Sequence, residues 1–193
     1  MKTTGLLVGV AAALAAGPAM AATLSGSVSS GSGSDTALIA GAQVTLYETA
    51  DGGPRQLAGA ITDAKGRFAL RLNADPAGGI LYAVARKGSA VELMTLVGAD
   101  LPDRIVIDEM TTISSAYALA RVLQAGQIPY RPLLPAKVAG GMAHNLVSPQ
   151  TGLPSEVMKA SPNADESNAW RLLGTLSNIL APCVRGGEDA CHQ

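Results

Sequence analysis

The pattern of apolar, glycine and proline residues changes near residue 108, and few folds are compatible with that change. Before it, short runs of β-type sequence alternate with glycine-rich turns; after it, alanine- and leucine-rich runs are separated by prolines. Short strands with frequent turn signals are typical of a β-sandwich, and the later runs have helical periodicity. The sequence therefore predicts an α+β fold, with a seven-stranded antiparallel β-sandwich followed by a small region of three helices.

The seven predicted strands are residues 23–28, 43–48, 56–62, 67–72, 80–86, 91–97 and 104–107. Charged residues cluster where two of these strands meet, in the sequence ITDAKGRFALRL at residues 61–72. A catalytic pair of Asp63 and Lys65 would need partial burial and perturbed pKa values, which the tip of a hairpin does not offer. We predict a turn, in which Asp63 accepts backbone hydrogen bonds and Gly66 adopts a positive φ.

Several residues of the first part carry a family resemblance. They are Gly26 and Val28, GAQVTL at 41–46, TDAKGRF at 62–68 and LYAVA at 81–85. Together they resemble the carboxypeptidase regulatory-like domain over residues 23 to 107, most specifically in the Thr-Asp-x-x-Gly-x-Phe element. The resemblance implies a prealbumin-like (transthyretin-like) seven-stranded sandwich with an accessory role, and it carries over no catalytic residue. The serine- and glycine-rich stretch at 29–34 departs from the family pattern.

The second part predicts three short helices. They run from Thr111 or Thr112 to about Gln124, from about Pro135 to just before Pro149, and from Ser161-Pro162 to Pro182. The apolar stripe of the first helix, at spacings of three and four, is Met110, Ile113, Tyr117, Ala120 and Leu123. Helices this short are not stable alone in water, so we expect them to pack on each other, on the sandwich or on a partner.

The first 21 residues are predicted to be a signal peptide, with Lys2, an apolar run at 6–16 and small residues at Ala19 and Ala21. That apolar run is shorter than the ~20 residues of a spanning helix. We therefore expect an exported protein, periplasmic or secreted, with no membrane span after cleavage. Its sandwich would occupy residues 22–107 and its helical region residues 108–193.

Charge and aromatic content argue against a nucleic-acid partner. The chain has 14 basic and 15 acidic side chains, and its aromatic residues are one Trp, one Phe and four Tyr. Phosphate backbones require a basic face and single strands require stacking platforms. We predict no nucleic-acid binding.

The side chains of metal and nucleophilic chemistry are scarce. His144 and His192 are the only histidines, whereas zinc sites use three or four His, Cys or carboxylate ligands. Neither Gly-x-Ser-x-Gly nor Ser-x-x-Lys occurs. Apolar residues interrupt the carboxylates between Asp100 and Glu109, so we interpret these as a solvated loop rather than a calcium site. The sequence predicts no metal, no cofactor and no enzymatic activity, with His144 on a helix surface.

Cys183 and Cys191 are the only cysteines. In an exported protein an even pair normally forms a disulfide, and a redox role would favour Cys-x-x-Cys spacing. We predict a structural disulfide between them.

Two hypotheses about function follow from these patterns. The first is an exported, non-catalytic accessory or structural module that acts through interaction with another protein, whose identity the sequence does not indicate. The alternative is a small apolar-ligand binding protein, with a pocket between sandwich and helices lined by Tyr117, Met142 and Trp170.

Overall fold

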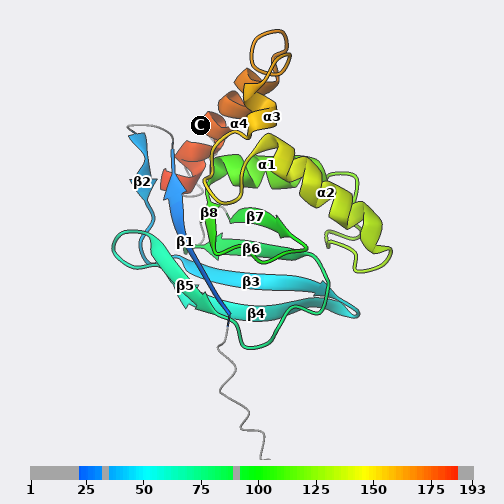
Figure 1. The fold of residues 1–193 in the computed structure, drawn as a ribbon. Coiled ribbons are helices and arrows are strands. Elements are labelled where there is room, and N and C mark those ends of the chain that lie inside the picture. Colours follow the sequence, from blue (N-terminus) through cyan, green and yellow to red (C-terminus); the bar gives the residue numbers. More distant parts are fainter. Residues whose placement is uncertain (1–21, 32–34, 89–91, 187–193) are drawn as a thin grey trace, which may run out of the picture.

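The computed structural model describes residues 22–31, 35–88 and 92–186. The strands are β1 (Thr23–Ser30), β2 (Ala37–Leu38), β3 (Gln43–Ala50), β4 (Gly53–Ile61), β5 (Arg67–Arg71), β6 (Leu81–Arg86), β7 (Leu93–Gly98) and β8 (Arg104–Ile107). The helices are α1 (Glu109–Leu119), α2 (Leu133–Leu146), α3 (Glu156–Lys159) and α4 (Ala169–Gly186). The class is α+β, as predicted, with the helices gathered on one side of the sheets (Figure 1). The predicted signal peptide lies outside the described residues.

The strands form two sheets that pack face to face. In the first sheet β1 pairs antiparallel with β2 and β5 and parallel with β8; the second has the antiparallel order β4-β3-β6-β7. The prediction of seven antiparallel strands was therefore wrong in two respects. Two residues are too few to show periodicity, which is why β2 was missed, and strand direction is set by the path of the connections rather than by local sequence.

The core between the sheets is aliphatic. Leu24, Leu46, Leu70 and Ile105 are completely buried there. At the crossing of β1 with its neighbours, Gly26 pairs with Phe68 of β5 and with Ile105 of β8. A Cβ at Gly26 would overlap the Phe68 ring and the Ile105 carbonyl oxygen. This position requires glycine because the two neighbours approach so closely.

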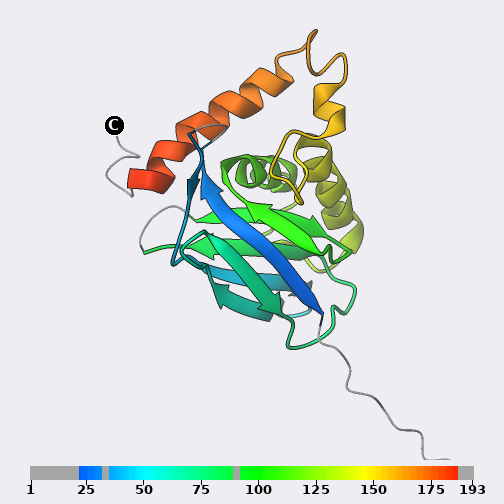
Figure 2. The ribbon, with the colours of Figure 1, turned by 60° about the vertical axis from the view of Figure 1, so that its left-hand side comes forward.

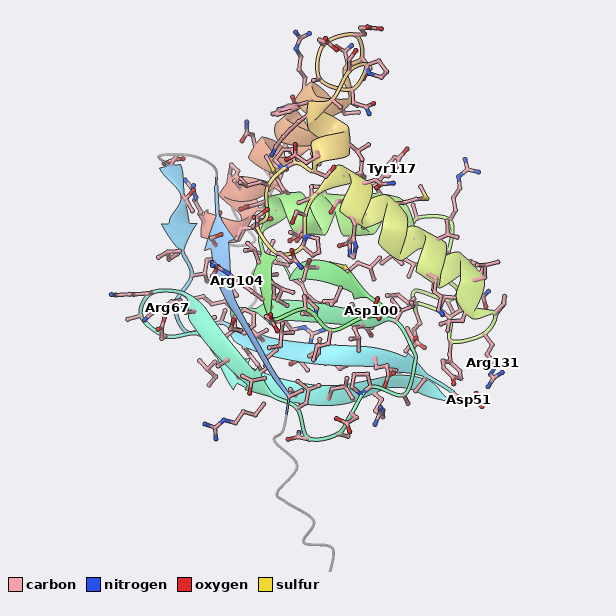
Figure 3. The ribbon with its side chains drawn as sticks, viewed as in Figure 1. Asp51, Arg67, Asp100, Arg104, Tyr117 and Arg131 are labelled. Carbon is pink, nitrogen blue, oxygen red and sulfur yellow. The ribbon has the colours of Figure 1, made fainter. Side chains whose placement is uncertain are left out.

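The charged residues within 61–72 form a turn, as predicted. The Asp63 carboxylate accepts hydrogen bonds from the backbone N–H groups of Lys65 (2.8 Å) and Arg67 (2.9 Å), and Gly66 has a φ of 65°. The backbone N–H of Arg67, above all, holds the pKa of Asp63 below its usual value. Arg67 lies at the outer edge of the sandwich, away from the helix α1 that carries Tyr117 (Figure 3).

The first helix begins one turn earlier than predicted. Asp108, rather than Thr111 or Thr112, is its N-cap: the Asp108 carboxylate accepts from the Thr111 N–H (2.8 Å), and the Thr111 hydroxyl accepts from the Asp108 N–H (3.0 Å). This reciprocal pair is a capping box built with threonine at the third position.

Side chains from the helices cover the free edge of the second sheet. β7 is the last strand of its sheet, so its outward peptide groups need partners other than a neighbouring strand. The Thr112 hydroxyl accepts from the Met94 N–H (3.0 Å), and the Ser115 hydroxyl accepts from the Leu96 N–H (2.9 Å). His144 Nε2 donates to the Leu96 carbonyl (3.0 Å), so this half-buried histidine is not the helix-surface residue that the sequence suggested.

The buried face of α1 therefore differs from the predicted apolar stripe. Ser114 and Ser115 are buried, whereas Tyr117 is 67% exposed; α1 ends at Leu119 rather than near Gln124, so Leu123, which is 42% exposed, lies beyond the helix. The peptide groups at the edge of β7 need hydrogen-bond partners. The side of α1 that carries hydroxyl groups therefore packs against this edge.

The last helix reaches back to the sandwich (Figure 2). It starts at Ala169 rather than at Ser161-Pro162. The sequence predicted an end at Pro182, but the helix continues through this proline to Gly186. Proline removes one helical hydrogen bond, but the turn beyond it packs Val184 against the sandwich core. The short helix α3 was not predicted, because four residues show no helical period.

A buried polar cluster joins β1 to α1 and α4. Glu109 is 2% exposed and its carboxylate accepts from the Ser30 hydroxyl (2.5 Å) and the Gly31 N–H (3.1 Å). Arg185, near the end of α4, donates to the Ser30 hydroxyl (3.3 Å) and pairs with Asp35 (2.9 Å). These bonds fix the helices on the sandwich.

Candidate binding surface on the helices

An apolar hollow of about 180 Å³ lies between the four helices. It is lined by Ile113, Tyr117, Leu146, Met158, Ala169, Leu172, Leu173 and Leu176. We call this hollow the apolar groove. Apart from the Tyr117 hydroxyl, every side chain that lines it is apolar, so it can bind by excluding water.

The floor of the groove is buried and its rim is exposed. Met158 and Leu173 on the floor are 2% and 5% exposed. On the rim, Tyr117, Leu172 and Leu176 are 67%, 57% and 39% exposed. Large apolar side chains that gather at an exposed rim are typical of an interaction surface rather than of a core.

The helix α4 is apolar on more than one face. Its buried side chains are Leu173, Ser177 and Ala181. Beside that stripe, Leu172, Leu176 and Ile179 face outward at spacings of four and three, and Ile179 is 65% exposed. A surface helix normally places polar residues there. The outer stripe of α4 is thus available to a partner.

Of the three predicted pocket residues, one lines the apolar groove. Tyr117 lines the apolar groove and projects from the helical layer away from the sheets (Figure 3). Met142 and Trp170 are 43% and 37% exposed and are not among the residues that line the groove. The groove lies between helices, whereas the sequence suggested a pocket between the sandwich and the helices.

The remaining predicted site residues are the two cysteines. Cys183 is half-buried near the end of α4, and Cys191 lies outside the described residues. Their disulfide stays a prediction.

Neither a metal centre nor a membrane span is found in the part of the chain that the structure describes. Within residues 22–31, 35–88 and 92–186, no group of three or more His, Cys, Asp or Glu side chains could hold a metal ion. In the same ranges, no helix combines the length and the apolar character needed to cross a bilayer.

Asp108, the N-cap of α1, is a buried carboxyl group. Burial raises its pKa to about 6, because desolvation outweighs the hydrogen bonds from Thr111. A folded-state pKa above the unfolded value means that the folded protein binds this proton more tightly. Stability from this group is therefore fully present at low pH and is lost as the pH rises through about 6.

We expect Asp108→Asn to remove this pH dependence, because asparagine keeps the capping oxygen and cannot ionise. Relative to the parent protein, the variant should gain roughly 2 kcal/mol in free energy of unfolding between about pH 4 and about pH 7. Urea unfolding of both proteins across this range measures the difference. A difference that does not change with pH would contradict the assignment to Asp108.

Comparison with known proteins finds low similarity. No family model and no curated protein matches the chain. A 9R-lipoxygenase from Cyanothece PCC8801 is 12% identical, with a TM-score of 0.31. The match covers 52% of this chain and 17% of the lipoxygenase. The 5-hydroxyisourate hydrolase of Klebsiella pneumoniae is 21% identical, with a TM-score of 0.29 over 45% of this chain and 86% of the hydrolase. Both are enzymes by name, but at these TM-scores neither likeness carries an activity over to this chain; the prediction that it is not an enzyme is withdrawn.

Proposed function

We propose that this protein acts by binding another protein, and that a helix of the partner occupies the apolar groove. The observation that carries this proposal is the outer stripe of α4. Leu172, Leu176 and Ile179 stand at positions i, i+4 and i+7 and are exposed, and the first two line the groove. This is the spacing by which one amphipathic helix recognises another.

The size of the groove favours a protein over a small ligand. Pockets for small molecules usually have volumes of about 300–1,000 Å³ and enclose most of the ligand, whereas the groove measures about 180 Å³ and has an exposed rim. A small apolar ligand remains the second candidate, because the lining has almost no polar atoms.

Charge indicates which kind of helix would fit. The helix α4 contains Arg171 and Arg185 and no acidic residue, and Arg171 directly precedes Leu172 of the outer stripe. Arg185 is already paired with Asp35. We therefore expect the partner helix to carry an aliphatic ridge with acidic side chains beside it, which also directs the encounter.

We also propose that the sandwich is of the transthyretin-like, carboxypeptidase regulatory-like type and that the protein is exported. The sequence element at 62–68, its Asp63-centred turn and the two packed sheets support the first part. The signal-peptide pattern at residues 1–21 and the cysteine pair support the second.

Site-specific crosslinking in cells that make the protein tests the groove. A photo-crosslinking side chain at position 176 should give a discrete adduct with one other protein, and Leu172→Glu should lower its yield about tenfold, the effect of losing about 1.4 kcal/mol of binding. The matched control places the crosslinker at Ile61, which is 72% exposed on the sandwich and should give no such adduct. Equal adducts from both positions, or none from position 176, would refute the proposal. An adduct with a small apolar molecule would favour the second candidate.

A further inference from the structure

A larger cleft, of about 570 Å³, lies between α2 and the loop that joins β7 to β8. One wall is a single face of α2, formed at spacings of three and four by Lys137, Gly140, Gly141 and His144. The other wall, residues 97–102, is the end of β7 with the loop that follows it, and residues 148–150 also line the cleft. We call it the polar cleft. It is separate from the apolar groove and shares no lining residue with it.

Glycine lets the two walls approach each other closely beside the cleft. A Cβ at Gly140 would lie 3.6 Å from the Cα of Gly98, and a Cβ at Gly98 would lie 3.3 Å from Cε1 of His144. Gly98 also has a φ of 102°, which side chains with a Cβ rarely adopt. Backbone and imidazole therefore meet here without side chains between them.

The hydrogen bond of His144 fixes what its ring can offer. A carbonyl oxygen can only accept, so the bond to Leu96 requires that Nε2 carries the hydrogen. In the neutral ring the other nitrogen, Nδ1, is then an acceptor. The bond to β7 also holds the orientation of the ring, which lines the polar cleft.

Two opposite charges line the polar cleft without neutralising each other. Lys137 comes from α2, and Asp100 comes from the loop below α2 (Figure 3). Among the described residues, neither forms an ion pair with any other side chain. An ammonium and a carboxylate that share a cleft and remain unpaired can each bind an opposite charge of one ligand.

We propose that the polar cleft binds a small zwitterion, an amino acid with an aliphatic side chain. Lys137 would hold its carboxylate, and Asp100 with Nδ1 of His144 would hold its ammonium group. Val97, Leu101, Pro102 and Pro149 supply apolar lining for the side chain. The volume lies within the range of about 300–1,000 Å³ typical of small-molecule sites. This proposal does not depend on the apolar groove.

Three probes that differ by one charged group test the proposal. They are L-leucine, 3-methylbutylamine, which lacks its carboxylate, and 4-methylpentanoate, which lacks its amine. Binding is followed by NMR shifts of the backbone amides of Gly98, Gly140 and Gly141. We expect leucine to shift these amides at millimolar concentration, and each truncated probe to bind about tenfold more weakly.

Two charge-removing variants separate the roles of the walls. Lys137→Gln should weaken leucine and 4-methylpentanoate but leave the amine unchanged, and Asp100→Asn should weaken leucine and the amine but leave the acid unchanged. Asp103→Asn is the matched control, because Asp103 follows in the same loop but does not line the cleft. Leucine binding that survives both variants, or the absence of shifts at these amides with all three probes, would overturn the proposal.

Discussion

Gly26→Ala should destabilise the protein by about 3 kcal/mol or more, a large part of the roughly 5–15 kcal/mol that holds a domain together. The added methyl group would overlap the Phe68 ring on one side and the Ile105 carbonyl oxygen on the other. The ring can turn only into a filled core, and the carbonyl belongs to the paired strand β8. Thermal and urea unfolding measure the loss.

Gly174→Ala is the matched control for this prediction. Gly174 lies inside α4, and a Cβ there would meet nothing within 4 Å. Alanine in a helix is favoured over glycine by about 0.8–1 kcal/mol, so the control should be slightly more stable than the parent. If both substitutions have the same effect, close approach is not the reason for glycine at position 26.

Glu48→Ala should cost about 3–5 kcal/mol, the usual result of removing one member of a buried charged network. The Glu48 side chain is 1% exposed, and its carboxylate accepts from Arg55 (2.5 Å) and from the N–H groups of Ala77 (2.6 Å) and Gly79 (2.8 Å). Burial by itself would raise the pKa of Glu48, but these hydrogen bonds outweigh it and lower the pKa. Alanine would leave the amides of the loop before β6 without their acceptor.

The control for Glu48 is a pair with similar chemistry on the surface. Arg86 and Glu92 form two hydrogen bonds (2.6 and 2.9 Å), but both side chains are about half exposed, at 52% and 47%. Exposed pairs contribute about 0–1 kcal/mol, so Glu92→Ala should change the free energy of unfolding by less than about 1 kcal/mol. Equal losses of unfolding free energy in the two variants would mean that burial is not the reason why the Glu48 network stabilises the fold.

Local sequence determined most of the strands and turns. Alternation of apolar residues in segments such as Phe68 to Leu72 reports which face is buried, and Asp63 with Gly66 specifies its turn through contacts within five residues. Such features depend on neighbours in the chain, so a single sequence reveals them. Strand direction depends instead on connections, which is why the parallel pairing of β8 with β1 was not predicted.

The helices show where local sequence was insufficient. Their approximate positions followed from periodicity, but the face that each one buries was decided by what it packs against. The free edge of β7 takes the hydroxyl side of α1 and the imidazole of His144, although an apolar stripe exists on the same helix. In α4, contacts made by Val184 and Arg185 with the sandwich carry the helix past Pro182.

Both candidate sites were decided by tertiary structure. Tyr117 was predicted to line a pocket, but only packing of four helices brings it beside Leu172 and Leu176, more than fifty residues away along the chain. The polar cleft likewise joins Asp100 to Lys137 and His144 through the close passage of α2 over Gly98. Sequence periodicity reports which residues share a face of one element, whereas a binding site requires faces of several elements to meet. That meeting depends on long-range packing, which local sequence does not contain.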